Sequence, residues 1–244
     1  MIRKQIPNLL TLCNLICGAL AAYMAVMGWL HRAAMFMMLG IVFDFLDGFA
    51  ARMLGVSSPV GKELDSLADV VTSGVAPAFI LFRMLMCFQG WKYWALLAFL
   101  MPAFAAYRLA KFNLDERQHE SFLGLPVPSN ALIWASLGLC VAHPDWAHVA
   151  LLPVPFIQWV LLSNTSLIVM ACLSMLTNVL MVSEVPMLGL KFKSFGWHGN
   201  EQRYILLIGA AVLIVLFGIF GIAIAILWYI LLSLICGRRQ CSKS

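Results

Sequence analysis

Charged side chains are scarce in this 244-residue sequence, because Asp, Glu, Lys and Arg together make up only 11% of it. Soluble domains carry about 25%. Apolar residues amount to 63%, which is more than a monomeric globule of this size buries, so the surplus is expected to face lipid. This composition excludes an intrinsically disordered chain. The net charge of +5 is spread in short basic groups between apolar runs, which suits a membrane surface and disfavours a nucleic-acid partner.

Cysteine offers little chemistry, although seven cysteines are present. Most lie inside apolar runs, where a thiol behaves as a small hydrophobic side chain. Cys13 and Cys17 are four positions apart, but no His or further Cys lies nearby to complete a zinc site. The first apolar run follows Arg3 and Lys4 and shows no small-residue cleavage site, so we expect a first membrane helix rather than a signal peptide.

Long apolar runs dominate the rest of the chain. A membrane helix needs about 20 largely apolar residues, and eight runs qualify. Their approximate ranges are 9–30, 33–54, 66–88, 91–112, 128–143, 165–184, 203–218 and 221–236. The segment 151–163 contains two prolines and is interpreted as interfacial, although a further span within 147–163 is an alternative. The last two runs meet at Gly218 and Gly221, so one hairpin and one long tilted helix both fit, and six or seven spans are alternatives to eight.

The basic residues give an orientation. With the N-terminus in the cytoplasm and eight crossings, 13 of the 16 Lys and Arg residues lie on the cytoplasmic side, in accord with the positive-inside rule. These are Arg3, Lys4, Arg52, Lys62, Arg108, Lys111, Arg117, Lys191, Lys193, Arg203, Arg238, Arg239 and Lys243. We therefore expect an integral, multi-pass protein of the bacterial inner membrane, with both termini and the functional site facing the cytoplasm.

Acidic residues number only 11, and four of the six aspartates fall between positions 44 and 69. An aspartate inside a membrane helix costs about 2.5–3.5 kcal/mol on insertion scales and is a functional candidate by default. Asp44 and Asp47 share a face of the second predicted helix, and Asp65 and Asp69 share a face at the start of the third. Because the second helix runs toward the cytoplasm and the third leaves it, the four carboxylates are expected to converge.

Four neighbouring carboxylates do not all stay ionised without a compensating positive charge. Mg²⁺ and Mn²⁺ prefer oxygen ligands, and two such ions bridged by shared carboxylates favour displacement at phosphorus. Helix-capping aspartates are the alternative, but capping accounts for one or two of the four. Gly48 leaves room for a ligand beside Asp47, and Arg52 is either a phosphate-binding arginine or one that marks the membrane boundary.

The spacing of these residues resembles the signature of a known protein family. The pattern Asp44-x2-Asp47-Gly48-x2-Ala51-Arg52-x8-Gly61-x3-Asp65-x3-Asp69 resembles the signature of the CDP-alcohol phosphatidyltransferase family. The resemblance implies an all-α polytopic membrane protein that transfers a phosphatidyl or similar group from a CDP-linked donor to an alcohol and releases CMP. It implies a six-helix catalytic core, here within residues 1–200, and leaves residues 201–244 as an additional transmembrane hairpin with a basic tail. It also suggests a homodimer.

Further stretches resemble the phosphatidylserine synthase branch of the family. They are residues 7–14, 65–78, 108–113, 122–128, 181–186 and 191–193. The branch implies CDP-diacylglycerol and L-serine as substrates. Glycerol phosphate and inositol are alternative acceptors, although a phosphorylated acceptor would require more arginines near the aspartates. A cation transporter is a remote alternative, because the acids gather at one end of the predicted helices and no internal repeat is visible.

Carried over position by position, the resemblance assigns roles to the four aspartates. Asp44 and Asp65 would contact both metal ions, while Asp47 would complete the shell of the first ion and Asp69 that of the second. Asp69 would also be the general base that takes the proton from the acceptor hydroxyl. Coordination lowers the basicity of a carboxylate, so we expect the proton to move late, when the acceptor oxygen is already bonding to phosphorus.

The remaining site residues are expected to bind the two substrates. The resemblance implies CDP-lipid contacts from Gly48, Arg52, Ser58, Asn8 and Thr11. Ser57 is an alternative to Ser58, and helix capping is an alternative role for Asn8 and Thr11. Arg108 and Lys111 at the end of the fourth predicted helix are candidates for the serine carboxylate, or ordinary membrane anchors, and Asn113 or Glu63 is a candidate for the ammonium group.

Overall fold

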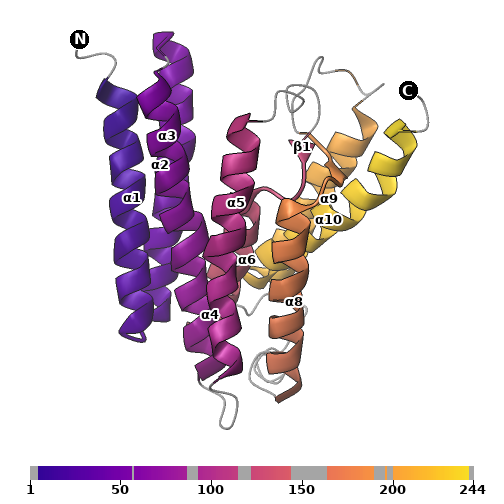
Figure 1. The fold of residues 1–244 in the computed structure, drawn as a ribbon. Coiled ribbons are helices and arrows are strands. Elements are labelled where there is room, and N and C mark those ends of the chain that lie inside the picture. Colours follow the sequence, from indigo (N-terminus) through magenta and orange to yellow (C-terminus); the bar gives the residue numbers. More distant parts are fainter. Residues whose placement is uncertain are drawn as a thin grey trace.

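The computed structural model describes residues 5–56, 58–86, 93–114, 122–143, 164–189, 196 and 200–241, without the side chains of 122, 164–167 and 236–241. The predicted interfacial segment 151–163 lies outside the described residues, as do six of the basic residues used for orientation: Arg3, Lys4, Arg117, Lys191, Lys193 and Lys243. Ser57 does too. Every predicted span falls on helix within the described ranges, and Figure 1 shows these helices as one elongated bundle.

The first two helices form an antiparallel pair, α1 (Gln5–Val26) and α2 (Leu30–Leu54), packed along their length. Gly28 has a φ of +82° in the turn between them, which glycine adopts without steric cost. Gly55 closes α2 in the left-handed conformation, and its backbone N–H bonds back to the carbonyl groups of Ala51 and Arg52. The chain therefore turns within a few residues and starts the next helix beside the end of α2.

The third continuous helix, here called the third rod, consists of three parts: α3 (Pro59–Asp69), the π-helical stretch η2 (Val70–Val75) and α4 (Ala76–Met86). The sequence predicts its start near residue 66, but the rod begins at Pro59, because Ser58 caps the helix by accepting a hydrogen bond from the N–H of Gly61 at 2.9 Å. Asp65 and Asp69 therefore lie in the second and third turns rather than at the helix start.

The remaining elements complete the bundle. They are η3 (Trp94–Phe99), α5 (Leu100–Leu114), β1 (Phe122–Leu123), α6 (Val127–Ala142), α8 (Asn164–Val182), β2 (Pro186–Met187), α9 (Glu201–Phe217) and α10 (Phe220–Cys241). Beyond the predicted helices, β1 and β2 form a short antiparallel ladder, with Phe122 opposite Met187 and Leu123 opposite Pro186. Gly218, at a φ of +56°, separates α9 from α10, and the two helices pack against each other. The last two runs are thus a hairpin, and the alternative of one long tilted helix is wrong.

The helices carry a membrane-facing surface outside a packed core. Four continuous helices, Gln5–Val26, Leu30–Leu54, Pro59–Met86 and Trp94–Leu114, are long and apolar enough to cross a bilayer, and Val127–Ala142, Ile168–Val182 and Phe220–Ile235 are shorter apolar helices. Large apolar side chains such as Leu9 and Phe45 are mostly exposed, which suits lipid contact. The core holds Met37, Ile80, Met101 and Trp134. The chain is an all-α polytopic membrane protein.

Candidate active site

A cleft of about 260 Å³ opens at the end of the bundle where α1 begins, α2 ends and α3 begins. Its lining comes from these helices and from the turn between α2 and α3. The lining residues are Pro7, Asn8, Thr11, Asp47, Gly48, Ala51, Val56, Ser58, Gly61, Lys62 and Asp65. Of the five predicted CDP-lipid residues, four line this cleft: Asn8, Thr11, Gly48 and Ser58.

Three of the predicted metal ligands meet at the cleft. One carboxylate oxygen each from Asp44, Asp47 and Asp65 lies within 4.8 Å of the other two. The antiparallel arrangement of α2 and α3 produces this group, here called the carboxylate cluster, because it brings the last turns of one helix beside the first turns of the next. Asp47 is only 6% exposed. Oδ1 of Asp65 is buried and has no hydrogen-bond partner.

The carboxylate cluster fits a divalent cation. No ion pair with Lys or Arg neutralises it within the part of the chain that the structure describes. Clustered carboxylates repel one another strongly where water is excluded. Oxygen ligands from carboxylates are the donor set that Mg²⁺ and Mn²⁺ prefer. The unpartnered Oδ1 of Asp65 is the kind of atom that a bound cation would satisfy.

Asp69 lies one turn beyond Asp65 and outside the 4.8 Å group. It is 8% exposed, and its Oδ1 accepts a hydrogen bond from Nδ2 of Asn14 at 3.3 Å. Asp44 and Asp65 are both close enough to repel its charge. Three of the four aspartates therefore form one tight group, and the fourth lies one helical turn farther along the chain, where it bonds to Asn14 of α1.

Polar residues of α1 hold the aspartates in place. The Thr11 hydroxyl, 3% exposed, donates to Oδ2 of Asp47 at 2.6 Å. Asn14, which bonds to Asp69, is itself held at its carbonyl by the Thr72 hydroxyl at 2.9 Å. Helix capping was the alternative role for Asn8 and Thr11, but both lie within α1, so the interhelical bond to Asp47 describes Thr11 better.

Two glycines of the cleft have different surroundings. A methyl group added at Gly48 would meet no protein atom within 4 Å, so the space beside it is open. A methyl group at Gly61 would come within 3.0 Å of the Ser58 hydroxyl oxygen and 3.1 Å of Oδ1 of Asn8. Gly61 thus keeps α1 and the start of α3 close together, whereas Gly48 leaves room for a ligand.

The two cations near the cluster differ in position. Arg52 is exposed near the end of α2 and does not line the cleft. Lys62 does line it, and its ammonium group donates to the backbone carbonyl of Asn113 at 3.1 Å. Lys62 was not among the predicted site residues, although its place directly after Gly61 in the signature was a usable signal.

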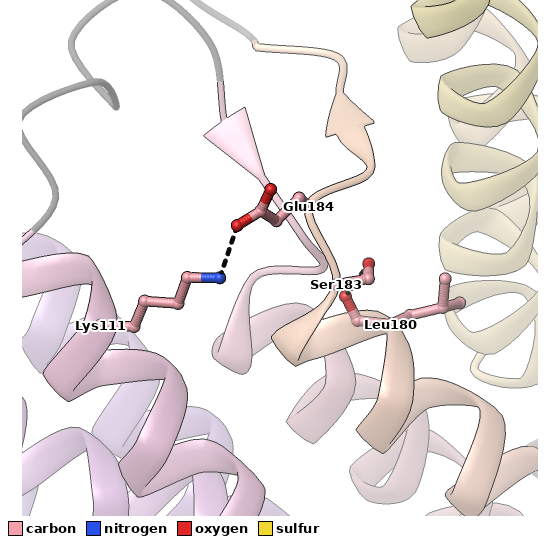
Figure 2. Close-up of polar contacts among 4 residues, drawn as sticks. All are labelled: Lys111, Leu180, Ser183 and Glu184. Atoms are coloured by element: carbon pink, nitrogen blue, oxygen red, sulfur yellow. Dashed lines mark hydrogen bonds and ion pairs between the residues drawn. The ribbon is translucent and has the colours of Figure 1, made fainter.

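The predicted serine-binding residues do not form one group. Lys111 pairs with Glu184 at 3.0 Å, an exposed ion pair shown in Figure 2, where Ser183 also donates to the carbonyl of Leu180 at 2.8 Å. Nδ2 of Asn113 donates to the hydroxyl oxygen of Ser66 at 2.9 Å, which ties α5 to α3. Arg108 is different, because it is 7% exposed and its Nε and Nη2 have no hydrogen-bond partner.

Several buried polar residues near the later helices were not predicted. Asn130, Ser174 and Asn178 are each at most 3% exposed and hold side-chain atoms without hydrogen-bond partners. The phenol O–H of Tyr229, half-buried on α10, donates to the backbone carbonyl of Leu188 at 3.3 Å. Each lies within a largely apolar run, which was the one signal that the sequence offered for them.

The chain is similar in sequence to several known proteins. A protein from Bacillus subtilis (strain 168) named CDP-diacylglycerol–serine O-phosphatidyltransferase is 38% identical over 128 residues, which are 51% of this chain and 70% of that protein. A protein of the same name from Helicobacter pylori (strain ATCC 700392 / 26695) is 30% identical over 207 residues, 83% of this chain and 78% of that protein. An archaetidylserine synthase from Methanothermobacter thermautotrophicus is 34% identical over 136 residues, 55% of this chain and 58% of its own length.

The family assignment rests on nearly the whole chain. A sequence model described as CDP-alcohol phosphatidyltransferase matches residues 4–236, a range that includes the carboxylate cluster, the cleft and the α9–α10 hairpin. The chain belongs to the CDP-alcohol phosphatidyltransferase family.

Proposed function

We propose that this protein transfers the phosphatidyl group of CDP-diacylglycerol to L-serine, forming phosphatidylserine and CMP. The observation that carries the proposal is the carboxylate cluster beside an open cleft, where Asp44, Asp47 and Asp65 lie within 4.8 Å of one another. Such a cluster suits binding of a diphosphate through divalent cations. The family to which the chain belongs uses CDP-linked donors.

The choice of serine rests on the relatives. The bacterial relatives carry names that specify CDP-diacylglycerol as donor and serine as acceptor, and the name of the archaeal relative specifies archaetidylserine as product. Serine is thus common to the three names, while the lipid differs. The aligned part of this chain spans between 58% and 78% of those proteins, so their activity is extended to this chain here as a proposal.

The metal would be held by the cluster. The family is generally metal-dependent, and we assign Asp44, Asp47 and Asp65 as ligands, with Asp69 completing the site for a second ion. Mg²⁺ and Mn²⁺ both fit this donor set. When bound, the ions neutralise the diphosphate and stabilise the charge on the departing CMP.

The protein itself supplies the base. The serine hydroxyl oxygen forms a bond to the phosphorus that carries diacylglycerol, the bond from that phosphorus to the CMP oxygen breaks, and the hydroxyl proton passes to Asp69. Asn14 orients this carboxylate through its hydrogen bond to Oδ1. The depth of Asp69 keeps bulk water away from the reacting oxygen.

Donor binding is assigned to the cleft. Gly48 lets the nucleotide diphosphate approach the backbone of α2, because the space beside it is open. Asn8 and Ser58 are the polar contacts on the opposite walls, and Lys62 adds a positive charge. Arg52 contributes from the exposed rim, while Thr11 acts on the donor through Asp47.

Acceptor binding is assigned mainly to Arg108, whose buried guanidinium is suited to a carboxylate. Asn113 lies beside α3 and is the candidate contact for the ammonium group. Lys111 takes a lesser part, because its charge is already paired with Glu184. This pocket distinguishes an amino-acid acceptor from a plain alcohol.

The placement in the membrane follows from the same assignment. The cleft end of the bundle, at which α1 begins and α10 ends, faces the cytoplasm of a bacterium, where CDP-linked lipids and serine meet. The acyl chains of the donor lie in the bilayer beside α2, and α9–α10 forms a unit added to the catalytic core of residues 1–200. The active protein is a homodimer.

One experiment tests the proposed function. Purified protein is given CDP-diacylglycerol with Mg²⁺ or Mn²⁺, and CMP release is measured separately with serine, glycerol 3-phosphate and inositol. We expect release with serine alone. Release with inositol or glycerol 3-phosphate instead would overturn the choice of acceptor and leave the family intact, whereas no release with any alcohol would overturn the activity.

A further inference from the structure

Thr72 is a fully buried residue of the π-helical stretch η2, three positions after the proposed general base. Its hydroxyl donates to the backbone carbonyl of Asn14 on α1 at 2.9 Å. The side-chain amide of the same Asn14 donates to Oδ1 of Asp69 at 3.3 Å. The third rod therefore holds Asn14 at two points, at its main chain through Thr72 and at its side chain through Asp69.

The amide of Asn14 is bonded at one end only. Its nitrogen donates to Asp69, whereas its oxygen Oδ1 is buried and has no hydrogen-bond partner. Because no bond fixes the oxygen, the direction in which the nitrogen donates depends on where the main chain of Asn14 lies. The Thr72 hydroxyl bonds to that main chain, so it bears on the contact between Asn14 and Asp69.

Thr72 has little room to move, because three helices meet around it. A methyl group added at Gly18 of α1 would overlap the Thr72 hydroxyl oxygen and lie 2.7 Å from its Cα. A methyl group added at Gly40 of α2 would lie 2.6 Å from the methyl carbon of Thr72 and 3.1 Å from Oδ1 of Asn14. The hydroxyl of Thr72 thus contacts α1, and its methyl group contacts α2.

The π-helical geometry begins directly after Asp69. In η2 the backbone N–H of Ala76 bonds to the carbonyl of Val71, five positions back. Such π turns are rare and frequently lie at functional sites. Within the described third rod, this stretch is also the part that packs against both α1 and α2 next to the proposed base.

We propose that Thr72 is a positioning residue for the general base and acts on Asp69 through Asn14. The inference rests on the proposed function, in which the Asp69 carboxylate takes the proton of the serine hydroxyl. That transfer requires the carboxylate within hydrogen-bond reach of the hydroxyl, and a small displacement of a reacting group lowers turnover strongly. Thr72 does not line the cleft, so its loss should lower kcat and leave KM for both substrates unchanged.

The test separates the hydroxyl of Thr72 from its methyl group, at saturating Mg²⁺. Thr72→Val keeps the branched shape and removes the bond to Asn14, so kcat with serine should fall about tenfold, the scale of one lost hydrogen bond. Thr72→Ser keeps the hydroxyl and loses the methyl contact at Gly40, so kcat should stay near wild type although the melting temperature falls. Thr177→Val is the matched control, because Thr177 of α8 is fully buried and its hydroxyl donates to the backbone carbonyl of Ser174 at 3.1 Å.

A second pair of variants makes the same comparison in a smaller side chain. Thr72→Ala and Thr72→Ser both lack the methyl group and differ only in the hydroxyl. We expect kcat of Thr72→Ala to be about tenfold below that of Thr72→Ser. This pair tests the hydroxyl even where Thr72→Val does not fold.

A double variant tests the route through Asn14. In an Asn14→Ala background the amide that contacts Asp69 is absent, so adding Thr72→Val should not lower kcat further. Two substitutions that act through one contact are not additive. If the two losses multiply instead, Thr72 does not act through Asn14 and the inference fails.

The remaining outcomes distinguish the inference from the proposed function. An unchanged kcat in Thr72→Val, in a preparation whose wild type releases CMP with serine, overturns the inference and leaves the proposed function standing. Equal losses of kcat in Thr72→Ser and Thr72→Val, in step with the melting temperature, also overturn it, because they indicate a structural role only. A wild type without serine-dependent release overturns both.

Discussion

The α1–α3 region and the α8–α10 region both bury polar atoms, but they satisfy them differently. In the first region the buried and half-buried groups include four carboxylates of one sign, close together and without a neutralising cation in the described ranges. In the second they are mostly single hydroxyl and amide groups, and some of them bond to backbone, as Ser233 and Tyr229 do at Leu188. The carboxylates of the first region therefore require a cation from outside the protein, whereas some polar groups of the second region are satisfied by the protein's own backbone.

Removing the metal should have the largest effect and act only on the first region. With EDTA in excess, CMP release should fall to background, because the donor diphosphate loses its positive partner. Mg²⁺ or Mn²⁺ should restore it. In the metal-free protein, Asp65→Asn should not lower the melting temperature, since it removes repulsion within the carboxylate cluster. Activity that survives full chelation would contradict the assignment of the cluster.

Asp69→Asn should separate proton transfer from binding of the ion that Asp44, Asp47 and Asp65 hold. The amide keeps the size of the side chain but accepts no proton, so turnover should fall by about 10²–10⁴-fold, the usual contribution of a general base. The ion held by Asp44, Asp47 and Asp65 should still bind, so Mg²⁺ should still raise the melting temperature, whereas the second ion, to which Asp69 is assigned, should bind more weakly. Near-normal turnover in this variant would remove Asp69 as the base.

Thr11→Val should lower the affinity for the metal ion, because Asp47 loses the hydrogen bond that orients its carboxylate. The substitution keeps the shape of the side chain and removes the 2.6 Å hydrogen bond to Oδ2. Loss of such an outer-shell contact typically reduces metal affinity by about 10–100-fold. A titration of activity against Mg²⁺ should therefore shift to higher concentration and reach a similar maximum. A lower maximum with an unchanged midpoint would instead indicate direct contact with the substrate.

Gly48→Ala should weaken donor binding without a loss of stability, whereas Gly18→Ala should lower the stability of the fold. At Gly48 the added methyl group meets no protein atom within 4 Å, so the melting temperature should hold while KM for CDP-diacylglycerol rises several-fold. At Gly18 the methyl group would overlap the hydroxyl oxygen of Thr72 and lie 2.7 Å from its Cα, so the protein should lose stability by about 1–3 kcal/mol through overpacking. Thermal unfolding and donor titration together separate the two.

Lys111→Met should have the smallest effect. Its ion pair with Glu184 is exposed, and such pairs contribute about 0.2–1 kcal/mol. We expect the melting temperature and KM for serine to change little, with Glu184→Gln behaving in the same way. A rise in KM for serine confined to Lys111→Met would show that the lysine, and not only Arg108, meets the acceptor carboxylate.

Much of the first region could be predicted from the sequence, because its chemistry is local. Asp44, Asp47, Asp65 and Asp69 lie within 26 positions on two successive helices, so helical periodicity and the short turn bring them together. The eight apolar runs likewise fall on helices. The start of the third helix was misplaced, because Ser58 and Pro59 define it through capping, whereas hydropathy rises only later.

The second region could not be predicted in the same way. Tyr229 meets the backbone carbonyl of Leu188 only because α10 packs against β2. Nothing in an apolar run indicates which distant helix a single tyrosine or asparagine faces. The pairing of Lys111 with Glu184 spans 73 positions and depends on where α8 ends. Long-range packing, not local pattern, determines these contacts.

The π-helical stretch η2 has a consequence for the rod that contains it. Each π turn holds one residue more than an α turn, so side chains after Val75 are rotated by about 100° from where an unbroken α-helix would direct them. The aspartates upstream and Ile80 or Met84 downstream are therefore out of phase with each other along one continuous axis. Deleting one residue from 70–75 would therefore rotate the two ends of the rod relative to each other. If the aspartates kept their direction, the apolar side chains downstream would no longer fit the core, and if those side chains kept their packing, the aspartates would turn away from the cleft.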